Sequence, residues 1–258
     1  MKLDNDNKSN SFISEKNNNE DKKIIFEQKP FNPNMELVTE IMPDDFKIYD
    51  LTFKIIILGD ASVGKSCLTM RATRNYFQEF YTPTIGFEFY TLIIKINDKY
   101  VKLQIWDTCG QESYRSLISS FYRNSSLAIL TYSINDEKSF NNLNSWLNEI
   151  KTQSNPDIII FLIGNKSDLI NERVISNEIA QNFAKNNNIP FFLETSAKTG
   201  YNVKNVFIEA AKKLFLNHLK YNGNISSNRA TIDCISNDSV SLKPDIEKDV
   251  EKKKKKCC

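Results

Sequence analysis

Short runs of apolar residues, each bounded by polar or turn residues, recur through the middle of the 258-residue chain. Six of them have the length and the β-branched and aromatic content of strands, and they read "FKIIILG", "FEFYTLIIKI", "YVKLQIWD", "LAILTY", "IIIFLIG" and "FFLE". Segments with helical periodicity alternate with most of them, and these read "KSCLTMRAT", "SFNNLNSWLNEIKTQ", "SNEIAQNFAKNN" and "NVKNVFIEAAKKLFLNHLK". This alternation predicts an α/β fold.

The predicted strands are almost continuously apolar, which is typical of a sheet that helices cover on both faces. The second and third strands are an exception, because only "NDK" within "IKINDKYVKL" joins them. A helical crossover needs a longer connection, so this pair should be antiparallel. The pattern therefore predicts a six-stranded, mixed and mainly parallel sheet with helices on both faces. Ligands of such sheets bind at the carboxyl ends of the strands.

Composition changes at both ends of this region. Eight of the first 34 residues are Asn, and such a segment buries too little apolar surface to offset the entropy of ordering it. Residues 1–50 are therefore predicted to be a low-complexity and largely disordered extension, within which 35–50 are apolar enough to pack on the domain. Residues 51–220 form the predicted folded domain, and 221–258 form a flexible polar tail.

Charge and cysteine content restrict the classes of partner. The formal net charge of +2 is small, so the chain as a whole indicates no nucleic-acid partner. The five cysteines have neither disulfide-like nor zinc-like spacing, which suits a reducing compartment. The apolar runs are too short to cross a bilayer, and the start "MKLDNDNKSN" has no apolar signal segment.

The first predicted strand ends in "GDASVGKS", which matches the pattern G-x-x-x-x-G-K-[ST] between a strand and a helix. Successive backbone N–H groups of such a loop form an anion site at a helix N-terminus. Lys65 can reach the β- and γ-phosphates of a nucleotide, and Ser66 can offer its hydroxyl to Mg²⁺. The predicted phosphate-binding residues are Gly59, Asp60, Ala61, Ser62, Val63, Gly64, Lys65, Ser66 and Cys67.

The third predicted strand ends in "WDTCGQE". Asp107 at the strand end can hold Mg²⁺ through water, and Gly110 can offer its backbone N–H to a γ-phosphate. Gln111 can orient an attacking water, which makes it the candidate catalytic residue. The string D-x-x-G is weak alone, but its place about 40 residues after a phosphate loop makes it specific.

Two further motifs indicate the base of the nucleotide. In "NKSD", the carboxylate of Asp168 can accept hydrogen bonds from N1–H and the exocyclic amine of guanine, whereas adenine lacks these donors and would leave the carboxylate unpaired. In "ETSAK", a backbone N–H near Ala197 can meet guanine O6. The predicted guanine-binding residues are Asn165, Lys166, Asp168, Ser196, Ala197 and Lys198.

With these four motifs in order, residues 51–220 resemble the Rab family of small GTPases, within the Ras superfamily. The strings "TIGFEF", "KLQIWDTCGQESYRSL", "FYRNSSLAILTYSI" and "SAKTGYNV" also fit the Rab pattern. The resemblance implies that Thr84 joins Ser66 and Asp107 at Mg²⁺. It also implies that Phe89, Trp106 and Phe121 form the aromatic triad that Rab effectors read, although such residues are also common in an ordinary core.

The last seven residues, "KKKKKCC", are explained by the same resemblance. It implies geranylgeranylation of Cys257 and Cys258, and Lys252–Lys256 provide a basic patch for anionic lipid. Each buried CH₂ contributes about 0.8 kcal/mol, so two chains anchor stably where one does not. The implied location is the cytoplasmic face of an intracellular endomembrane, with a cytosolic pool. The implied partners are GTP and GDP, an exchange factor, a GTPase-activating protein, a Rab escort protein, a GDP-dissociation inhibitor and effectors.

The chain departs from the Rab pattern at four positions of the domain. Cys109 replaces a common Ala, and Ser133 replaces a common acidic residue. Ala61 and Ser62 stand where fast GTPases often have Gly, which predicts slow intrinsic turnover. Two other functions stay open from the residues: an ATPase or nucleotide kinase, which "NKSD" disfavours, and a nucleotide-binding scaffold without turnover, which Gln111 disfavours.

Overall fold

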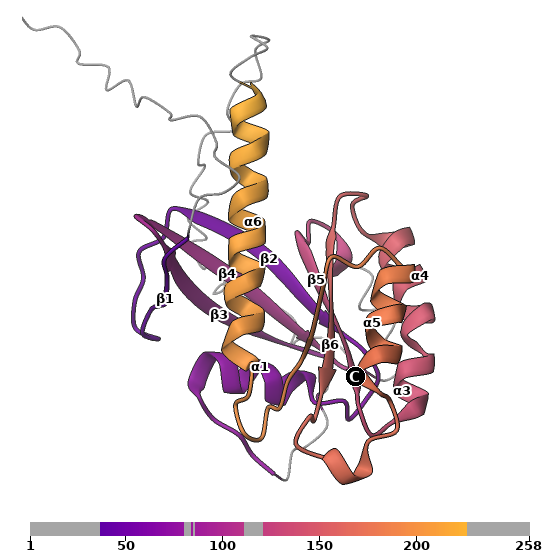
Figure 1. Cartoon of the computed structure of the whole chain (residues 1–258). Coiled ribbons are helices and arrows are strands. Elements are labelled where there is room, and N and C mark those ends of the chain that lie inside the picture. Colours follow the sequence, from indigo (N-terminus) through magenta and orange to yellow (C-terminus); the bar gives the residue numbers. More distant parts are fainter. Residues whose placement is uncertain (1–36, 80–83, 85, 111–120, 226–258) are drawn as a thin grey trace, which may run out of the picture.

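The computed structural model describes residues 37–79, 84, 86–110 and 121–225 (Figure 1). Within them, seven strands form one sheet in the order β1-β3-β4-β2-β5-β6-β7. The strands are β1 (Thr39–Ile41), β2 (Leu51–Leu58), β3 (Phe87–Ile96), β4 (Lys99–Thr108), β5 (Leu127–Ser133), β6 (Ile159–Asn165) and β7 (Phe191–Glu194). The helices are α1 (Lys65–Arg74), α3 (Glu137–Asn141), α4 (Leu143–Gln153), α5 (Asn177–Asn186) and α6 (Val203–Ile225), with a 3₁₀ turn η2 (Ile170–Glu172).

The directions of the strands confirm the predicted mixed sheet. Strand β2 pairs in parallel with β4 and β5, and β6 pairs in parallel with β5 and β7. Strands β3 and β4 are antiparallel over their full length, from Phe87 opposite Thr108 to Ile96 opposite Lys99. The tight turn between them contains Asn97 with φ 55°, a left-handed conformation that Asn tolerates better than most residues.

The strand count of six is corrected to seven, because β1 lies in the segment predicted as an extension. Strand β1 pairs antiparallel with the end of β3, where Thr39 lies opposite Ile96. The backbone N–H of Asn97 donates to Val38 O at 2.9 Å, and Asp50 Oδ2 accepts the Tyr100 N–H at 2.7 Å. A three-residue strand is too short to show a period of two, so the sequence pattern did not reveal it. Residues 1–36 lie outside the described part of the chain.

Two apolar layers cover the sheet, one on each face. Ile55 and Ile57 of β2 pack in the layer that holds α1 and α6, whereas Ile56 and Leu58 pack in the layer that holds α4 and α5. All four side chains are fully buried. The buried half of this central strand, residues 55–58, is continuously apolar, as expected for a strand covered on both faces.

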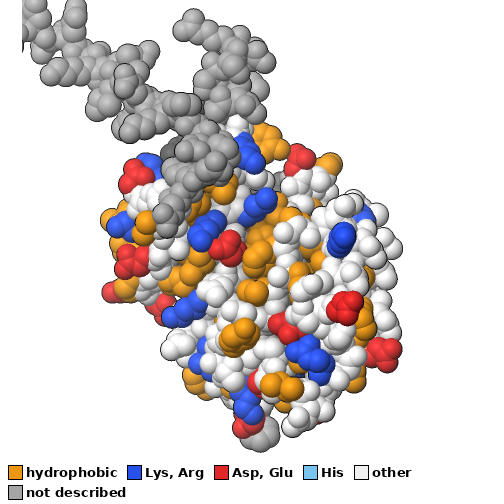
Figure 2. All heavy atoms as spheres, in the orientation of Figure 1, with side chains coloured by type: hydrophobic (Ala, Val, Ile, Leu, Met, Phe, Trp, Pro, Cys, Tyr) orange, Lys and Arg blue, Asp and Glu red, His pale blue; other side chains and the backbone are white. Residues whose placement is uncertain are grey.

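On the face of the molecule that bears α6, acidic and basic side chains are interspersed with hydrophobic ones rather than gathered in one patch of a single sign (Figure 2). None of the helices within the described ranges combines the length and apolar character that a bilayer span requires.

Candidate functional site

A cavity of about 450 Å³ is the place where the four predicted motifs meet. Its lining includes residues that precede and begin α1, residues that follow β4, and the loops that follow β6 and β7. The predicted site residues in this lining are Ala61, Ser62, Gly64, Lys65, Ser66, Cys67, Thr84, Gly110, Asn165, Lys166, Asp168, Ala197 and Lys198. Residues so far apart in the sequence thus form one site at the carboxyl ends of β2, β4, β6 and β7, as expected for a sheet of this kind.

Some predicted residues are not part of this lining. Five are absent from the lining of the cavity: Gly59, Asp60, Val63, Asp107 and Ser196. The candidate catalytic Gln111, the basic patch Lys252–Lys256 and the predicted lipid sites Cys257 and Cys258 fall outside the described residues.

The phosphate loop depends on glycine at two positions. Gly59 has φ 136°, and a Cβ there would lie 2.1 Å from the Thr131 carbonyl oxygen. Gly64 is the N-cap of α1 with φ 95°, and glycine has no side chain with which to cap the helix. The first backbone N–H groups of α1 therefore remain available for an anion beside the cavity.

The buried ammonium of Lys65 closes the same loop. Its Nζ donates to Gly59 O at 2.9 Å and to Asp60 O at 2.8 Å, and the residue is 5% exposed. Burial lowers the pKa of Lys65 to about 8, against the opposing charges of Asp107 and Asp60. An anion in the cavity would further offset the desolvation of this buried cation and favour its charged form.

Three oxygen-bearing side chains are arranged as a candidate magnesium site. Ser66 Oγ lies 2.8 Å from Thr84 Oγ1. Asp107 is fully buried, and within the described residues neither oxygen of its carboxylate has a hydrogen-bond partner. Burial raises the pKa of Asp107 to about 6, although the nearby Ser66 and Lys65 oppose the shift. A buried carboxylate without partners, beside two hydroxyls, fits the oxygen ligands that Mg²⁺ prefers.

Gly110 brings the segment after β4 directly against the phosphate loop. A Cβ at Gly110 would lie 2.3 Å from the backbone nitrogen of Ala61 and from the carbonyl carbon of Asp60, so no larger residue fits without a shift of the backbone. Beside it, the Cys109 N–H donates to Gly86 O at 3.0 Å. The segment that ends at Gly86 and the segment that follows β4 therefore contact each other, and the latter also contacts the phosphate loop.

Asn165 connects the guanine loops to the phosphate loop. Its Nδ2 donates to Val63 O at 2.9 Å, and its Oδ1 accepts from Thr195 Oγ1 at 3.2 Å. The Ala197 N–H, predicted to meet guanine O6, donates to Asn165 Oδ1 over a long 3.3 Å. Ser196 Oγ donates to Asp168 Oδ1 at 2.5 Å, which orients that carboxylate. The two guanine motifs are thus joined before any base is bound.

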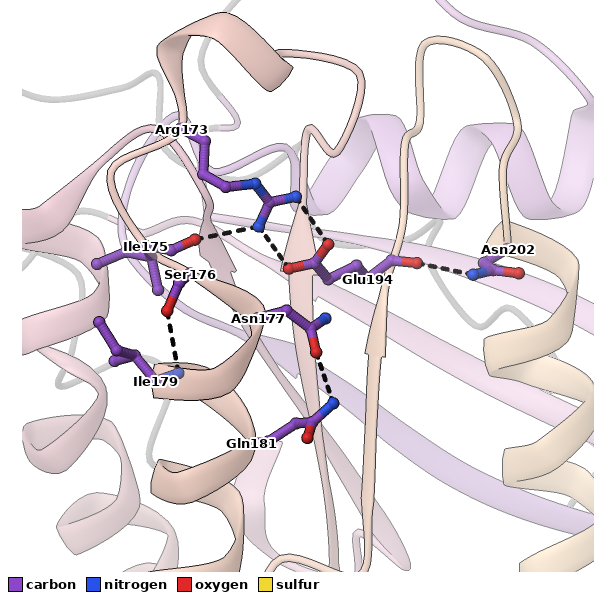
Figure 3. Close-up of polar contacts among 8 residues, drawn as sticks. All are labelled: Arg173, Ile175, Ser176, Asn177, Ile179, Gln181, Glu194 and Asn202. Atoms are coloured by element: carbon purple, nitrogen blue, oxygen red, sulfur yellow. Dashed lines mark hydrogen bonds and ion pairs between the residues drawn. The ribbon is translucent and has the colours of Figure 1, made fainter.

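Sequence reasoning missed several residues that position these loops. Asp60 accepts from Asn142 Nδ2 at 2.6 Å and from Trp146 Nε1 at 2.8 Å, so its side chain is tied to α4 and its N-cap residue. Arg173, which follows "NKSD" in the chain, and Glu194, which directly precedes the second guanine loop, form a bidentate ion pair (Figure 3). No local pattern identifies such partners, because they are 21 to 86 residues apart.

Arg71 was also missed. Its guanidinium donates to the carbonyl oxygens of Ala197, Lys198 and Asn75. The segment between α1 and Thr84 contributes Phe77, Gln78 and Glu79 to the cavity lining. The one sequence signal for a role of this segment in the cavity lining is that it directly precedes the predicted Mg²⁺ residue Thr84.

A comparison with protein families matches the Ras family over residues 54–216, which is more than half of the chain. The matched range runs from β2 into α6 and includes every motif that meets at the cavity. Members of this family bind guanine nucleotides and hydrolyse GTP, and the phosphate loop, Asp107 and "NKSD" are the features of the site that this activity requires. The chain therefore belongs to the Ras family, and its folded domain is that of a small GTPase.

Proposed function

We propose that this GTPase is a Rab-type switch, tethered to an intracellular membrane, which recruits effector proteins during vesicle traffic while GTP is bound. The observation that carries the proposal is an aromatic cluster beside the nucleotide site, in which Phe87 and Phe89 are about half exposed and Trp106 and Phe121 are partly buried against the core. The Rab-like strings in the sequence support the same assignment.

The rings of this surface form one contiguous cluster. Phe89 lies opposite Trp106 across the β3–β4 pair, with ring centroids 5.0 Å apart, and Trp106 is 5.0 Å from Phe121. Phe87 adds a fourth ring, 4.4 Å from Phe121. Phe87 and Phe89 are 48% and 47% exposed. Core packing accounts for the partly buried Trp106 and Phe121 but not for the two half-exposed Phe rings, whereas protein-binding surfaces are rich in exposed aromatic residues.

The position of the cluster suits a surface that reports the state of the nucleotide. Strand β3 begins directly after Gly86, and β4 ends directly before Cys109, where the Cys109 N–H donates to Gly86 O. The aromatic residues are therefore one or a few residues from the segments that GTP would order. Lys54 Nζ lies 5.3 Å from the Trp106 ring centroid and fixes the inner edge of the cluster.

In the proposed cycle, the γ-phosphate accepts hydrogen bonds from the Gly110 N–H and from the backbone of Thr84, which orders both segments. Gln111 orients the attacking water. When bound at Ser66, Thr84 and Asp107, Mg²⁺ supplies positive charge to the phosphate oxygens. Ala61 and Ser62 add bulk beside the γ-phosphate position, and Ser62 has φ 64°, so we expect slow hydrolysis without an activator.

The membrane tether is proposed from the sequence of the tail. Geranylgeranyl groups on Cys257 and Cys258 would supply most of the binding, and each residue of Lys252–Lys256 would add about 1 kcal/mol at an anionic surface. A Rab escort protein and a GDP-dissociation inhibitor would carry the lipidated form, and an exchange factor and a GTPase-activating protein would set its nucleotide. The proposed location is the cytoplasmic face of an endomembrane.

Intact-mass analysis of the protein from the membrane and cytosolic fractions of its own cells tests the proposal. We expect two geranylgeranyl groups on the wild-type protein. The double variant Cys257→Ser with Cys258→Ser should carry neither group, and it should be soluble and still bind GDP. The matched control is Cys234→Ser, which should keep both lipids. Free thiols at Cys257 and Cys258 in a membrane-bound pool would contradict the proposed tether.

A further inference from the structure

Arg71 lies in the middle of α1, the helix that begins with Lys65 and Ser66 at the phosphate end of the cavity. Its side chain points toward the guanine end of the cavity, where Nε donates to Ala197 O at 2.8 Å and Nη2 donates to Lys198 O at 2.5 Å. One half-buried side chain therefore connects the phosphate-binding helix to the loop that follows β7.

The same guanidinium also holds the segment that leaves α1. Its Nη1 donates to Asn75 O at 3.2 Å, and its Cζ lies 5.9 Å from the ring centroid of Phe77. Lys198 Nζ in turn lies 3.3 Å from Glu79 Oε1. Phe77, Glu79 and Lys198 all line the cavity, so these contacts cross its rim on the guanine side.

The chemistry of arginine suits this arrangement. The planar guanidinium offers five N–H donors in fixed directions, so it can satisfy three carbonyls from two loops at once. A lysine ammonium is a compact point charge and cannot span acceptors that lie on different sides. The carbonyl of Ala197 belongs to the residue whose N–H is predicted to meet guanine, so the bond from Arg71 fixes the peptide plane next to that donor.

We infer that Arg71 is a positioning residue that holds residues 195–198 against α1 and thereby sets the rate at which the guanine nucleotide dissociates. The inference rests on guanine-nucleotide binding at this cavity, and it adds a residue outside the four motifs. Because the bonds to Asn75 and to residues 197 and 198 share one guanidinium, displacement of the segment 75–79 also loosens the guanine loop.

The test measures dissociation of a fluorescent GDP analogue, chased by excess GDP in the presence of Mg²⁺. Arg71→Met keeps most of the apolar stem of the side chain but ends before the guanidinium and so removes every donor. We expect dissociation about tenfold faster than in the wild type, since hydrogen bonds from a charged group typically contribute that much. Arg71→Lys should give an intermediate rate. The matched control is Arg74→Met, because Arg74 is exposed at the end of the same helix and contacts Tyr90 rather than the guanine loop.

A second readout separates positioning from general damage to the domain. Arg71→Met should raise the rate of nucleotide dissociation and leave the rate of single-turnover hydrolysis of bound GTP unchanged. Chelation of Mg²⁺ should accelerate dissociation by the same factor in all variants. The inference is overturned if Arg71→Met releases the analogue at the same rate as Arg74→Met. It is also overturned if Arg71→Met lowers the rate of single-turnover hydrolysis by the same factor by which it raises the rate of dissociation. A wild type that retains no guanine nucleotide would instead overturn nucleotide binding at the cavity itself.

Discussion

Arg173 and Glu194 face each other with two parallel hydrogen bonds, from Nη1 to Oε1 at 2.7 Å and from Nη2 to Oε2 at 2.8 Å (Figure 3). Arg173 follows the "NKSD" loop and η2, and Glu194 is the last residue of β7 before the second guanine loop. The Glu194 carbonyl also accepts from Asn202 Nδ2 at 3.0 Å. The pair therefore connects the segment that follows the first guanine loop to the strand that precedes the second, and neither residue is in the lining of the cavity.

Removal of one partner of this pair should destabilise the domain. The side chains are only 25% and 13% exposed, so Arg173→Met leaves a poorly solvated carboxylate, and we expect a loss of about 1–3 kcal/mol in the free energy of unfolding. Urea denaturation of GDP-loaded protein measures it. The double variant Arg173→Met with Glu194→Gln should recover part of the loss, because it leaves no unpaired charge. Lys212→Met is the control, since its surface pair with Glu209 should contribute at most about 0.5 kcal/mol.

Asp168→Asn should change the base that the site selects. Guanine presents two donors to the carboxylate, whereas xanthine presents an acceptor at the exocyclic position, which the Asn amide can meet. We expect preference to shift from GDP toward XDP by about a hundredfold or more, as for sites built around hydrogen bonds to a substrate. Competition of unlabelled nucleotides against a fluorescent GDP analogue gives the ratio. Asp157→Asn, at an exposed loop position, should leave it unchanged. Equal binding of ATP and GTP by the wild type would refute guanine recognition by "NKSD".

Gln111→Leu should hold the protein in its GTP state, because the leucine side chain cannot orient a water. With an activator present, we expect single-turnover hydrolysis to fall by about a hundredfold or more. Release of inorganic phosphate is the measurement, and Gln153→Leu at the exposed end of α4 is the matched control. Unchanged hydrolysis in Gln111→Leu would show that another group positions the water.

His218 should titrate below its ordinary range. Burial lowers the pKa of His218 from 6.5, and its ring lies edge-on to Phe53 with centroids 6.2 Å apart. Since the folded pKa is below the unfolded one, the neutral form is favoured by folding. The resulting stability is present in full above the unfolded pKa of about 6.5 and is lost as the pH falls from there through the lower folded pKa. His218 is the one histidine of the chain, so a single imidazole signal in NMR gives the pKa directly. A titration midpoint above 6.5 would contradict the prediction, and His218→Gln should flatten the pH dependence of unfolding in this range.

Much of the fold and of the site follows from local sequence. The continuous apolar run of β2 indicates a strand covered on both faces, and the two-residue turn at Asn97 and Asp98 requires an antiparallel pair. The phosphate loop is equally local, because strand, glycine turn and helix follow one another within residues 51–74. These features depend on periodicity and turn chemistry, which are properties of neighbours in the chain.

Tertiary structure alone decided which distant groups meet. Strand β1 forms where residues 39–41 pair with the edge of β3, and although Thr39 and Ile41 favour a strand, three residues are too few to predict one. The contact of Arg71 with Ala197 spans 126 positions, and that of Asp60 with Trp146 spans 86. Every residue has a backbone carbonyl oxygen, whatever its type. A side chain that binds such oxygens therefore cannot be recognised from the sequence before the chain is folded.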